Sequence, residues 1–271
     1  MNSINKKGTA VVTGASSGLG EIFADRLAQR GYNLILVARR KERLELLAEK
    51  LQSKHRVNVT IVVADLSSEA DLQNVADDLK NDESITLLIN NAGTATLAPS
   101  TTTSVAQQKA MVDVNVTALM ILSNAVLPLF IAKNEGTIIN IASVLGLYSL
   151  PFSSVYSGTK GFVIQYTRGL QQELKETNVR VQLVNPATTA TEIWEVGGVP
   201  LSALEQSTIM STEDCVDAAL SGLDNGELAT YPSVNDQKLI DTYEDARIKL
   251  FSGSQNGKPA ERYIQSGLTS L

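Results

Sequence analysis

Short apolar runs alternate along the chain with longer segments in which apolar residues recur every three or four positions. The short runs predict β-strands, and the longer periodic segments predict helices that pack along one face. Strands are predicted at residues 9–12, 33–38, 57–64, 85–89, 137–142, 180–184 and 227–231. This alternation is typical of an α/β fold in which helices cover both faces of a parallel sheet.

The predicted helices fill the intervals between these strands. They lie at about residues 22–28, 40–53, 68–80, 102–131, 155–176, 212–223 and 236–251. We expect Pro128 to kink or end the longest of them, because a proline removes a helical hydrogen bond and crowds the preceding turn. Ser211 and Asp214 have the spacing of a capping box, which marks the start of the helix at 212–223.

Two segments lie outside this pattern. Residues 190–212 carry apolar side chains interrupted by glycines and a proline, which favours a lid over an apolar substrate pocket. A packed helix and loop would give nearly the same pattern. Residues 252–271 form a polar C-terminal tail. Because no repeat or linker divides the chain, we interpret residues 1–271 as a single domain.

Composition and charge exclude several classes of protein. Apolar residues make up 43% of the 271 residues and charged residues 19%, which provides for a core and argues against disorder. The net charge is −6 and no long run of Lys and Arg is present, so we expect no nucleic-acid partner. No apolar run reaches the roughly 20 residues that span a bilayer, and the first residues lack the apolar core of a signal peptide. We therefore expect a cytoplasmic protein without a membrane partner.

The single cysteine and the single histidine suggest no further chemistry. Cys215 fits a reducing cytosol and leaves no internal disulfide. No basic residue lies close in sequence to activate its thiol, and we interpret it as structural. His55 lies in a polar connector and is interpreted as a surface residue. No metal site is predicted, since it would have to be built around this one histidine.

The first predicted strand leads directly into a glycine-rich turn at residues 13–20, TGASSGLG. Glycines let the backbone approach a pyrophosphate, and the N-terminus of the following helix offers free N–H groups and the positive end of its dipole. The spacing G-x-x-x-G-x-G differs from G-x-G-x-x-G, and the turn lacks the lysine of a Walker P-loop. We predict a nucleotide-phosphate site here, with a glycine turn that binds no ligand as the weaker alternative.

Arg39 and Arg40 follow the second strand, where NAD enzymes place an acidic side chain on the adenosine ribose. A guanidinium can bind a 2′-phosphate with two hydrogen bonds, and no carboxylate is present to repel it. The pair therefore favours NADP over NAD. The alternative for both arginines is an exposed helix start, which fits Arg40 about equally well. Asp65, just past the third strand, can accept a hydrogen bond from the adenine amino group. Its alternative is an N-cap or loop role, for which Ser67 and Ser68 compete.

Tyr156 and Lys160 stand one helical turn apart, with roughly 5–6 Å between their Cβ atoms. An ammonium group about 4 Å away favours the phenolate, and can lower the pKa of the Tyr156 phenol from about 10 toward neutral pH. Such a pair by itself is common on helix surfaces. Ser143 ends the fifth strand, at the edge where open α/β sheets bind ligands. Asn115 lies in an apolar helical run and needs a specific partner, such as a water or a carbonyl.

Together these residues resemble the short-chain dehydrogenase/reductase family over roughly residues 6–231. The matching motifs, in chain order, are residues 13–20 (TGxxxGxG), 90–93 (NNAG), Asn115, Ser143 and Tyr156-x-x-x-Lys160. The resemblance implies a Rossmann-like, doubly wound parallel sheet of about seven strands with helices on both faces. It also implies an NAD(P)-dependent oxidoreductase that forms a homodimer or homotetramer.

The resemblance assigns catalytic roles to four residues. Tyr156 would exchange a proton with the substrate oxygen as hydride moves, and Ser143 would hydrogen-bond that oxygen. Lys160 would lower the pKa of Tyr156 and bind the nicotinamide ribose, while Asn115 would support a proton-relay water. The residues assigned to the cofactor are Gly14, Ser16, Ser17, Gly18, Leu19, Gly20, Arg39, Arg40, Asp65, Leu66, Asn91, Ala92, Gly93, Tyr156, Lys160, Pro186, Thr189 and Thr191.

One position departs from the family. Its members commonly have Pro-Gly after the sixth strand, and this chain has Pro186-Ala187. A positive φ would be costly for Ala187, so we expect the loop on the nicotinamide side to differ.

We therefore predict an NADP(H)-dependent oxidoreductase that transfers hydride between the nicotinamide and a carbonyl or secondary alcohol of a small, fairly apolar substrate. A 3-oxoacyl or hydroxysteroid-type redox enzyme differs only in substrate and stays open. A catalytically silent, cofactor-binding regulator is the alternative outside the enzymes. The complete set of four catalytic residues argues against it.

Overall fold

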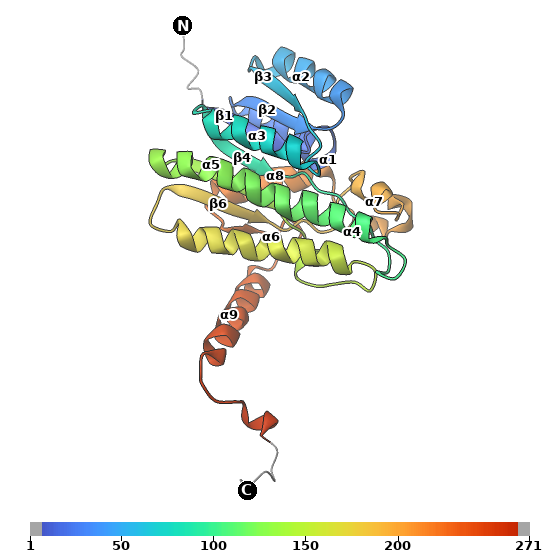
Figure 1. Cartoon of the computed structure of the whole chain (residues 1–271), viewed down its shortest axis with the longest axis vertical. Coiled ribbons are helices and arrows are strands. Elements are labelled where there is room, and N and C mark those ends of the chain that lie inside the picture. The colour runs from blue at the N-terminus through green and yellow to red at the C-terminus, as the bar shows by residue number, and fades with distance from the viewer. Residues whose placement is uncertain (1–6, 265–271) are drawn as a thin grey trace. The chain divides into compact units, whose positions relative to one another are not determined.

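The computed structural model describes residues 7–264, so the last seven residues of the predicted tail lie outside the described part of the chain. Seven strands form one sheet in the order β3-β2-β1-β4-β5-β6-β7, and every pair of neighbours is parallel (Figure 1). The strands are β1 Thr9–Thr13, β2 Asn33–Ala38, β3 Val59–Val63, β4 Ile85–Asn90, β5 Gly136–Ile141, β6 Val179–Val184 and β7 Ala229–Thr230. The predicted doubly wound α/β fold is confirmed.

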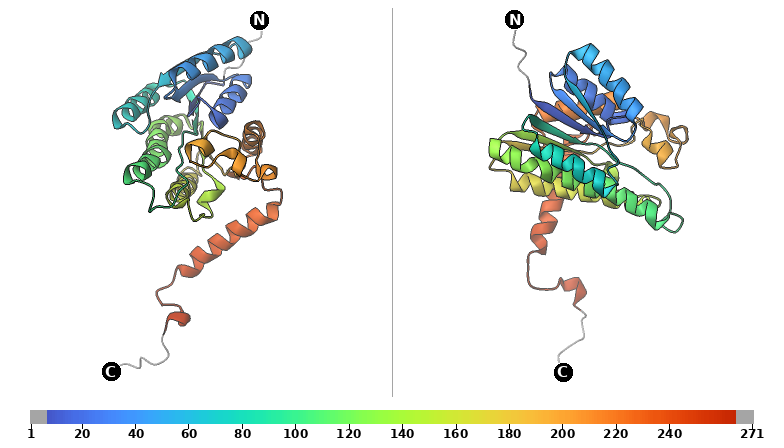
Figure 2. Two further views of the ribbon diagram at one scale, coloured as in Figure 1. Left: turned by 90° about the vertical axis from the view of Figure 1, so that its right-hand side faces the viewer. Right: turned by 45° about the horizontal axis from the view of Figure 1, so that its top comes forward.

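Helices cover both faces of the sheet (Figure 2). One face carries α1 Gly18–Gln29, α2 Lys41–His55 and α8 Thr212–Asp224; the other carries α3 Glu69–Asn81, α4 Val105–Val112, α5 Leu119–Lys133 and α6 Ser154–Glu173. Along β1, Ala10 and Val12 pack in the core on the α1–α2–α8 face, and Val11 packs in the core on the opposite face. Because successive side chains of a strand point to opposite faces, a strand buried on both faces needs an unbroken apolar run.

The order of the strands determines where a ligand can bind. From β1 the chain builds outward through β2 and β3, and it then returns to add β4 on the other side of β1. The loops that follow β1 and β4 leave the sheet at the same edge and diverge, which opens a crevice there. The glycine-rich turn follows β1, and residues 91–93 follow β4.

The longest predicted helix is present, and one expectation about it is wrong. Helices α4 and α5 are joined by a π-helical turn, Asp113–Ala118, into one helix over Val105–Lys133. Pro128 lies inside α5 and does not end it. The proline is exposed, as is Asn124 one turn earlier, so water can solvate the carbonyl that lost its partner.

The same helix also meets the length and composition of a membrane span, which the count of uninterrupted apolar runs did not reveal. In this fold it is a helix of the core. Leu122, Val126 and Phe130 are at most 1% exposed and pack in the core on the α3–α6 face of the sheet. Burial accounts for the apolar residues of this side, whereas Val112 and Ile131 of the same helix are exposed.

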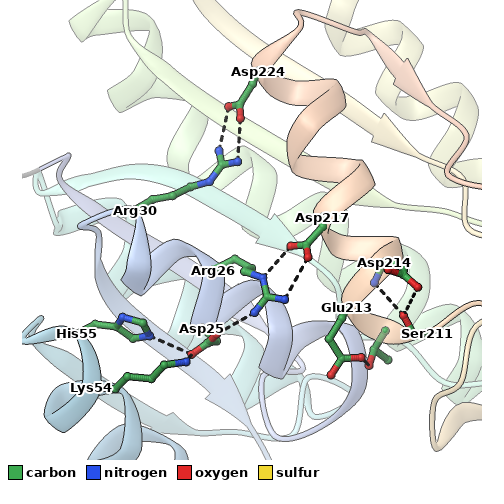
Figure 3. Close-up of polar contacts among 11 residues, drawn as sticks. Asp25, Arg26, Arg30, Lys54, His55, Ser211, Glu213, Asp214, Asp217 and Asp224 are labelled. Carbon is green, nitrogen blue, oxygen red and sulfur yellow. Dashed lines mark hydrogen bonds and ion pairs between the residues drawn. The ribbon is translucent and has the colours of Figure 1, made fainter.

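Ion pairs connect helix α1 to the neighbouring helices α8 and α2 (Figure 3). Arg26 pairs with Asp217 of α8 at 2.7 Å, and Asp25 receives Lys54 and His55 of α2 at 2.8 and 2.9 Å. The interpretation of His55 as a surface residue is wrong, since its side chain is only 10% exposed. Helix α2 continues to this residue and brings it against α1, which its polar sequence neighbours could not indicate.

The chain divides into two compact units, residues 1–233 and 234–271. The described part of the second unit contains α9, Gln237–Ser254, and a short 3₁₀ turn at Glu261–Tyr263. Every residue of α9 is exposed or half-buried. The helix predicted at 236–251 is present, and the interpretation of the whole chain as a single domain stays a prediction.

Candidate active site

A cavity of about 500 Å³ opens at the carboxyl edge of the sheet. Its wall brings together most of the residues proposed from the sequence: Gly14, Ser16, Ser17, Gly18, Leu19, Arg39, Arg40, Asp65, Leu66, Asn91, Ala92, Gly93, Ser143, Tyr156, Lys160, Pro186, Thr189 and Thr191. Gly20 and Asn115 are not part of the wall and act behind it. The cavity therefore joins the glycine turn at one end to the tyrosine and serine at the other.

The glycine turn is held against the loop after β4. Asn91 Nδ2 donates to the Thr13 carbonyl oxygen at 2.9 Å, and Thr13 Oγ1 accepts from the backbone N–H groups of Asn91 and Ala92 at 3.0 Å. Gly14 has a φ of +67°, which a side chain would disfavour. A Cβ at Gly20 would collide with the Gly14 carbonyl oxygen. Glycine is thus needed at both positions for the turn to pack against the start of α1.

The N-terminus of α1 suits a phosphate. Its N-cap residue, Ser17, makes no side-chain capping hydrogen bond to the first turn. The Ser17 hydroxyl instead accepts a 2.6 Å hydrogen bond from Arg40 Nη2. The N–H groups of the first helical turn therefore keep their capacity to bind an anion in the cavity, with a guanidinium beside them.

Arg40 is not merely an exposed helix start. Its Nε donates to Ser16 Oγ at 3.1 Å, and its Nη1 donates to Glu192 Oε2 at 2.7 Å. The expectation that no carboxylate lies near the arginine pair is wrong, because Glu192 lies 152 positions further along the chain and meets Arg40 only in the fold. Arg39 is more exposed than Arg40, and both line the cavity.

Asp65 lies in the cavity wall just past β3 and is not a helix cap. Its Oδ1 accepts from the backbone and hydroxyl of Ser67 at 2.9 and 2.7 Å, whereas Ser68 is the N-cap of α3. Burial acts to raise the pKa of the Asp65 carboxyl, but the hydrogen bonds from Ser67 and the charge of Arg39 lower it overall. The carboxylate is thus ionised in the wall, and its contact with an adenine stays a prediction.

Tyr156, Lys160 and Ser143 are all buried, with exposures of 8%, 5% and 9%. The predicted lowering of the Tyr156 pKa by Lys160 is wrong for this arrangement. Burial raises the pKa of the phenol to about 12, against an opposing effect of the Ser143 hydroxyl. Burial also lowers the pKa of Lys160 to about 8. The ammonium group does not bond to the phenol; it donates to the Ile141 carbonyl oxygen at 2.9 Å.

These protonation states define what the site can do. At neutral pH the Tyr156 phenol keeps its proton and can donate it. Ser143 Oγ, at the end of β5, accepts a hydrogen bond from the Leu145 backbone at 3.1 Å, which leaves its own proton to donate. Two O–H donors in one wall of a cavity suit an oxygen atom that gains negative charge during reaction.

Asn115 has the specific partners that its burial requires. It lies in the π-helical turn and is 1% exposed. Its Oδ1 accepts from the Thr94 backbone N–H at 2.9 Å, and its Nδ2 donates to the Thr94 carbonyl at 2.9 Å and to Thr159 Oγ1 at 3.0 Å. Thr159 Oγ1 in turn donates to the Tyr156 carbonyl oxygen at 2.7 Å. Asn115 thus supports the backbone at Tyr156, a link that the sequence did not reveal; its part in a water relay stays a prediction.

The loop after β6 carries no strain at Ala187. Among the described residues, the non-glycine positions with positive φ are Arg56 and Asn134. Ala187 therefore avoids the positive φ that would be costly for it, and the expected difference of this loop from that of the family stays a prediction. The Pro186 carbonyl accepts from the Val144 backbone at 3.0 Å, which joins this loop to the one that carries Ser143.

Apolar side chains surround the tyrosine end of the cavity. The segment at 190–212 contains a four-residue helix, α7 Ile193–Val196, and two 3₁₀ turns. Ile193, Trp194 and Val196 line the cavity together with Leu97, Leu145 and Leu150 from other loops. Trp194 Nε1 donates to the Thr189 carbonyl oxygen at 2.9 Å. Leu97 and Leu150 lie in loops and Leu145 in a 3₁₀ turn, Val144–Gly146, so no helical periodicity in the sequence indicated them.

Comparison with known proteins agrees with this geometry. Residues 8–197 match the family model described as short chain dehydrogenase. The chain is 40% identical over 186 residues to sulfoacetaldehyde reductase 2 from Chromohalobacter salexigens, an alignment that covers 67% of this chain and 73% of that protein.

Two solved structures are similar over nearly the whole chain. The first is a short-chain dehydrogenase from Sphingobium yanoikuyae in complex with NADPH, with a TM-score of 0.91 and 39% identity, covering 94% of this chain and 100% of that one. The second is a bulky-bulky ketone specific alcohol dehydrogenase from Comamonas testosteroni, with a TM-score of 0.87 and 35% identity, covering 96% of this chain and 100% of that one. The chain therefore belongs to the short-chain dehydrogenase/reductase family and is an oxidoreductase of that family.

Proposed function

We propose that the protein is an NADP(H)-dependent oxidoreductase that interconverts a carbonyl and a secondary alcohol on a small, fairly apolar substrate. One observation carries the proposal. A protonated Tyr156 and the Ser143 hydroxyl share a cavity wall with Lys160, and the same cavity ends at a glycine turn flanked by Arg39 and Arg40. The proton donors and the phosphate-binding groups are thus joined by one continuous space.

In the reducing direction the bound cofactor supplies the hydride. Tyr156 donates its phenolic proton to the carbonyl oxygen of the substrate, and Ser143 donates a hydrogen bond to the same oxygen. Lys160, held by its hydrogen bond to the Ile141 carbonyl, would bind the ribose hydroxyls of the cofactor. In the oxidising direction Tyr156 must first lose its proton to solvent, and the phenolate then accepts the alcohol proton.

The choice of NADP rests on the arginine pair, since the two positions that follow β2 hold Arg39 and Arg40 and no acidic residue. The Sphingobium relative was solved with NADPH, which agrees with this choice. The choice of substrate class rests on the apolar wall around Tyr156, and the Comamonas relative is described as acting on ketones. A homodimeric or homotetrameric, cytoplasmic enzyme is our further expectation.

The test is an assay of NADPH and NADH oxidation with a panel of ketones, aldehydes and diketones. We expect turnover with NADPH and little with NADH. Tyr156→Phe should lose nearly all turnover while still binding NADPH, as measured by calorimetry. Wild-type protein that binds NADPH but reduces none of these carbonyls would instead favour a cofactor-binding regulator.

A further inference from the structure

The Glu192 carboxylate forms ion pairs with two arginines at the start of α2. Its Oε2 accepts from Arg40 Nη1 at 2.7 Å, and its Oε1 accepts from Arg43 Nη1 at 2.6 Å. Glu192 directly precedes α7, whereas Arg40 and Arg43 stand at the start of α2. The carboxylate therefore bridges the segment after β6 to the helix after β2, and its pKa is lowered to about 2, first by Arg43 and then by Arg40.

The groups around this carboxylate make a site for an anion. Arg40 also donates to Ser16 Oγ at 3.1 Å and to Ser17 Oγ at 2.6 Å, so one guanidinium group and two hydroxyls gather at the N-terminus of α1, and Arg43 holds the other oxygen of Glu192. Glu192, Arg40 and both serines line the cavity. Planar guanidinium groups, hydroxyls and a helix N-terminus are the donors that bind phosphate groups in proteins. In this structure the protein's own carboxylate holds the arginines of this cluster.

We propose that Glu192 is an internal competitor for the 2′-phosphate of the cofactor and thereby sets the preference of the enzyme for NADPH over NADH. A carboxylate and a phosphate cannot share the donors of Arg40 without repulsion between their charges. The phosphate must therefore displace Glu192, which releases the segment before α7 from α2. This inference rests on the NADP(H) function proposed above and adds a residue that the family motifs do not include.

The proposal makes a selective prediction. NADH has no 2′-phosphate and does not need Arg40, so Glu192 opposes the binding of NADPH alone. The Glu192 side chain is 46% exposed, and ion pairs of this kind are modest. Glu192→Gln should therefore tighten NADPH binding about threefold to fivefold and change NADH binding by less than about twofold.

The experiment is isothermal titration of full-length wild-type protein, Glu192→Gln and Glu195→Gln with NADPH and with NADH. Glu195 is an exposed carboxylate of α7, three positions after Glu192, so its variant removes an equal charge from this segment without touching the arginine pair. We expect Glu195→Gln to bind both nucleotides as the wild type does. Tighter NADPH binding confined to Glu192→Gln supports the proposal.

Two results would overturn it: weaker NADPH binding in Glu192→Gln, which would make Glu192 a clamp, or equal changes with NADPH and NADH. In an Arg40→Gln background, Glu192→Gln should no longer tighten NADPH, and a gain that persists there would also overturn it. The experiment measures binding and not turnover. A protein that binds NADPH selectively but reduces no carbonyl would therefore contradict only the proposed catalysis and not the role of Glu192. Wild-type protein that binds neither nucleotide would overturn both.

Discussion

Lys160 Nζ lies 5.7 Å from the centre of the Tyr156 ring and donates its hydrogen bond to the carbonyl oxygen of Ile141, the last residue of β5. The two side chains stand one turn apart on α6, and both are buried. Burial disfavours the charged form of each group, so it raises the pKa of the phenol to about 12 and lowers that of the amine to about 8. At neutral pH the pair holds a neutral acid beside a cation.

The pH dependence of the free enzyme should follow Lys160. Its pKa is lowered to about 8, so the ammonium is present below that pH and is lost above it. The value of kcat/KM with NADPH as the varied substrate reports groups of the free enzyme, and we expect it to fall as pH rises through about 8. Lys160→Arg should move this fall to higher pH, because a guanidinium stays charged. A profile that is flat to pH 10 in the wild type would contradict this assignment.

The chain of hydrogen bonds from Asn115 through Thr159 to the Tyr156 backbone should matter for activity as well as for stability. Thr159→Val removes the hydroxyl that accepts from Asn115 and donates to the Tyr156 carbonyl. An unsatisfied buried donor costs about 1–3 kcal/mol, so we expect a loss of that size in urea unfolding and at least a tenfold loss in kcat.

Thr167 offers a matched control for Thr159. It lies two turns further along α6, accepts from Asn140 Nδ2 at 3.0 Å and donates to the Val163 carbonyl oxygen at 2.7 Å. Thr167→Val should cost similar stability and leave kcat close to the wild-type value. Equal losses of kcat in the two variants would show that the effect is general instability of α6.

Stability should depend on the carboxylate of Asp25. Burial opposes ionisation, but hydrogen bonds from Lys54 and His55 lower its pKa from 3.8 to about 2. The side chain is only 11% exposed, so this difference contributes about 2 kcal/mol above pH 4, and the contribution is lost as pH falls through about 2.

We therefore expect Asp25→Asn to lower the free energy of unfolding by about 2 kcal/mol at pH 7 and by clearly less near pH 2, measured by urea denaturation. Asp217→Asn breaks the ion pair between α8 and Arg26 of α1. The Asp217 carboxylate is 52% exposed, so the loss of this pair should cost less than about 1 kcal/mol. A cost for Asp25→Asn that does not change with pH would refute the role of its charge.

The glycine turn should tolerate no side chain at position 20. In Gly20→Ala the new Cβ meets the Gly14 carbonyl oxygen and the Asn91 amide, so the turn must move away from α1. NADPH binding by calorimetry should weaken at least tenfold. Gly169→Ala, in a helix with open space around the new methyl group, should leave binding unchanged. Normal NADPH binding by Gly20→Ala would mean that the turn does not hold the phosphates.

Much of the molecule was determined by the sequence at short range. A strand buried on both faces needs a continuous apolar run. Residues four positions apart on a helix, as Tyr156 and Lys160 are, lie on the same side of it. These relations depend on backbone geometry, so the seven strands, the glycine turn and the tyrosine–lysine pair follow from neighbouring residues. The family resemblance then indicated which of the scattered polar residues meet at the edge of the sheet.

Tertiary structure alone decided the contacts and charges. Glu192 meets Arg40 from 152 positions away, His55 reaches Asp25 through the packing of α2 on α1, and Asn115 finds Thr94 and Thr159. Burial reversed the expected shift of the Tyr156 pKa, because desolvation depends on every segment that covers a group. Local sequence sets the direction of the backbone, but only the complete fold determines which side chains lose water and which partners replace it.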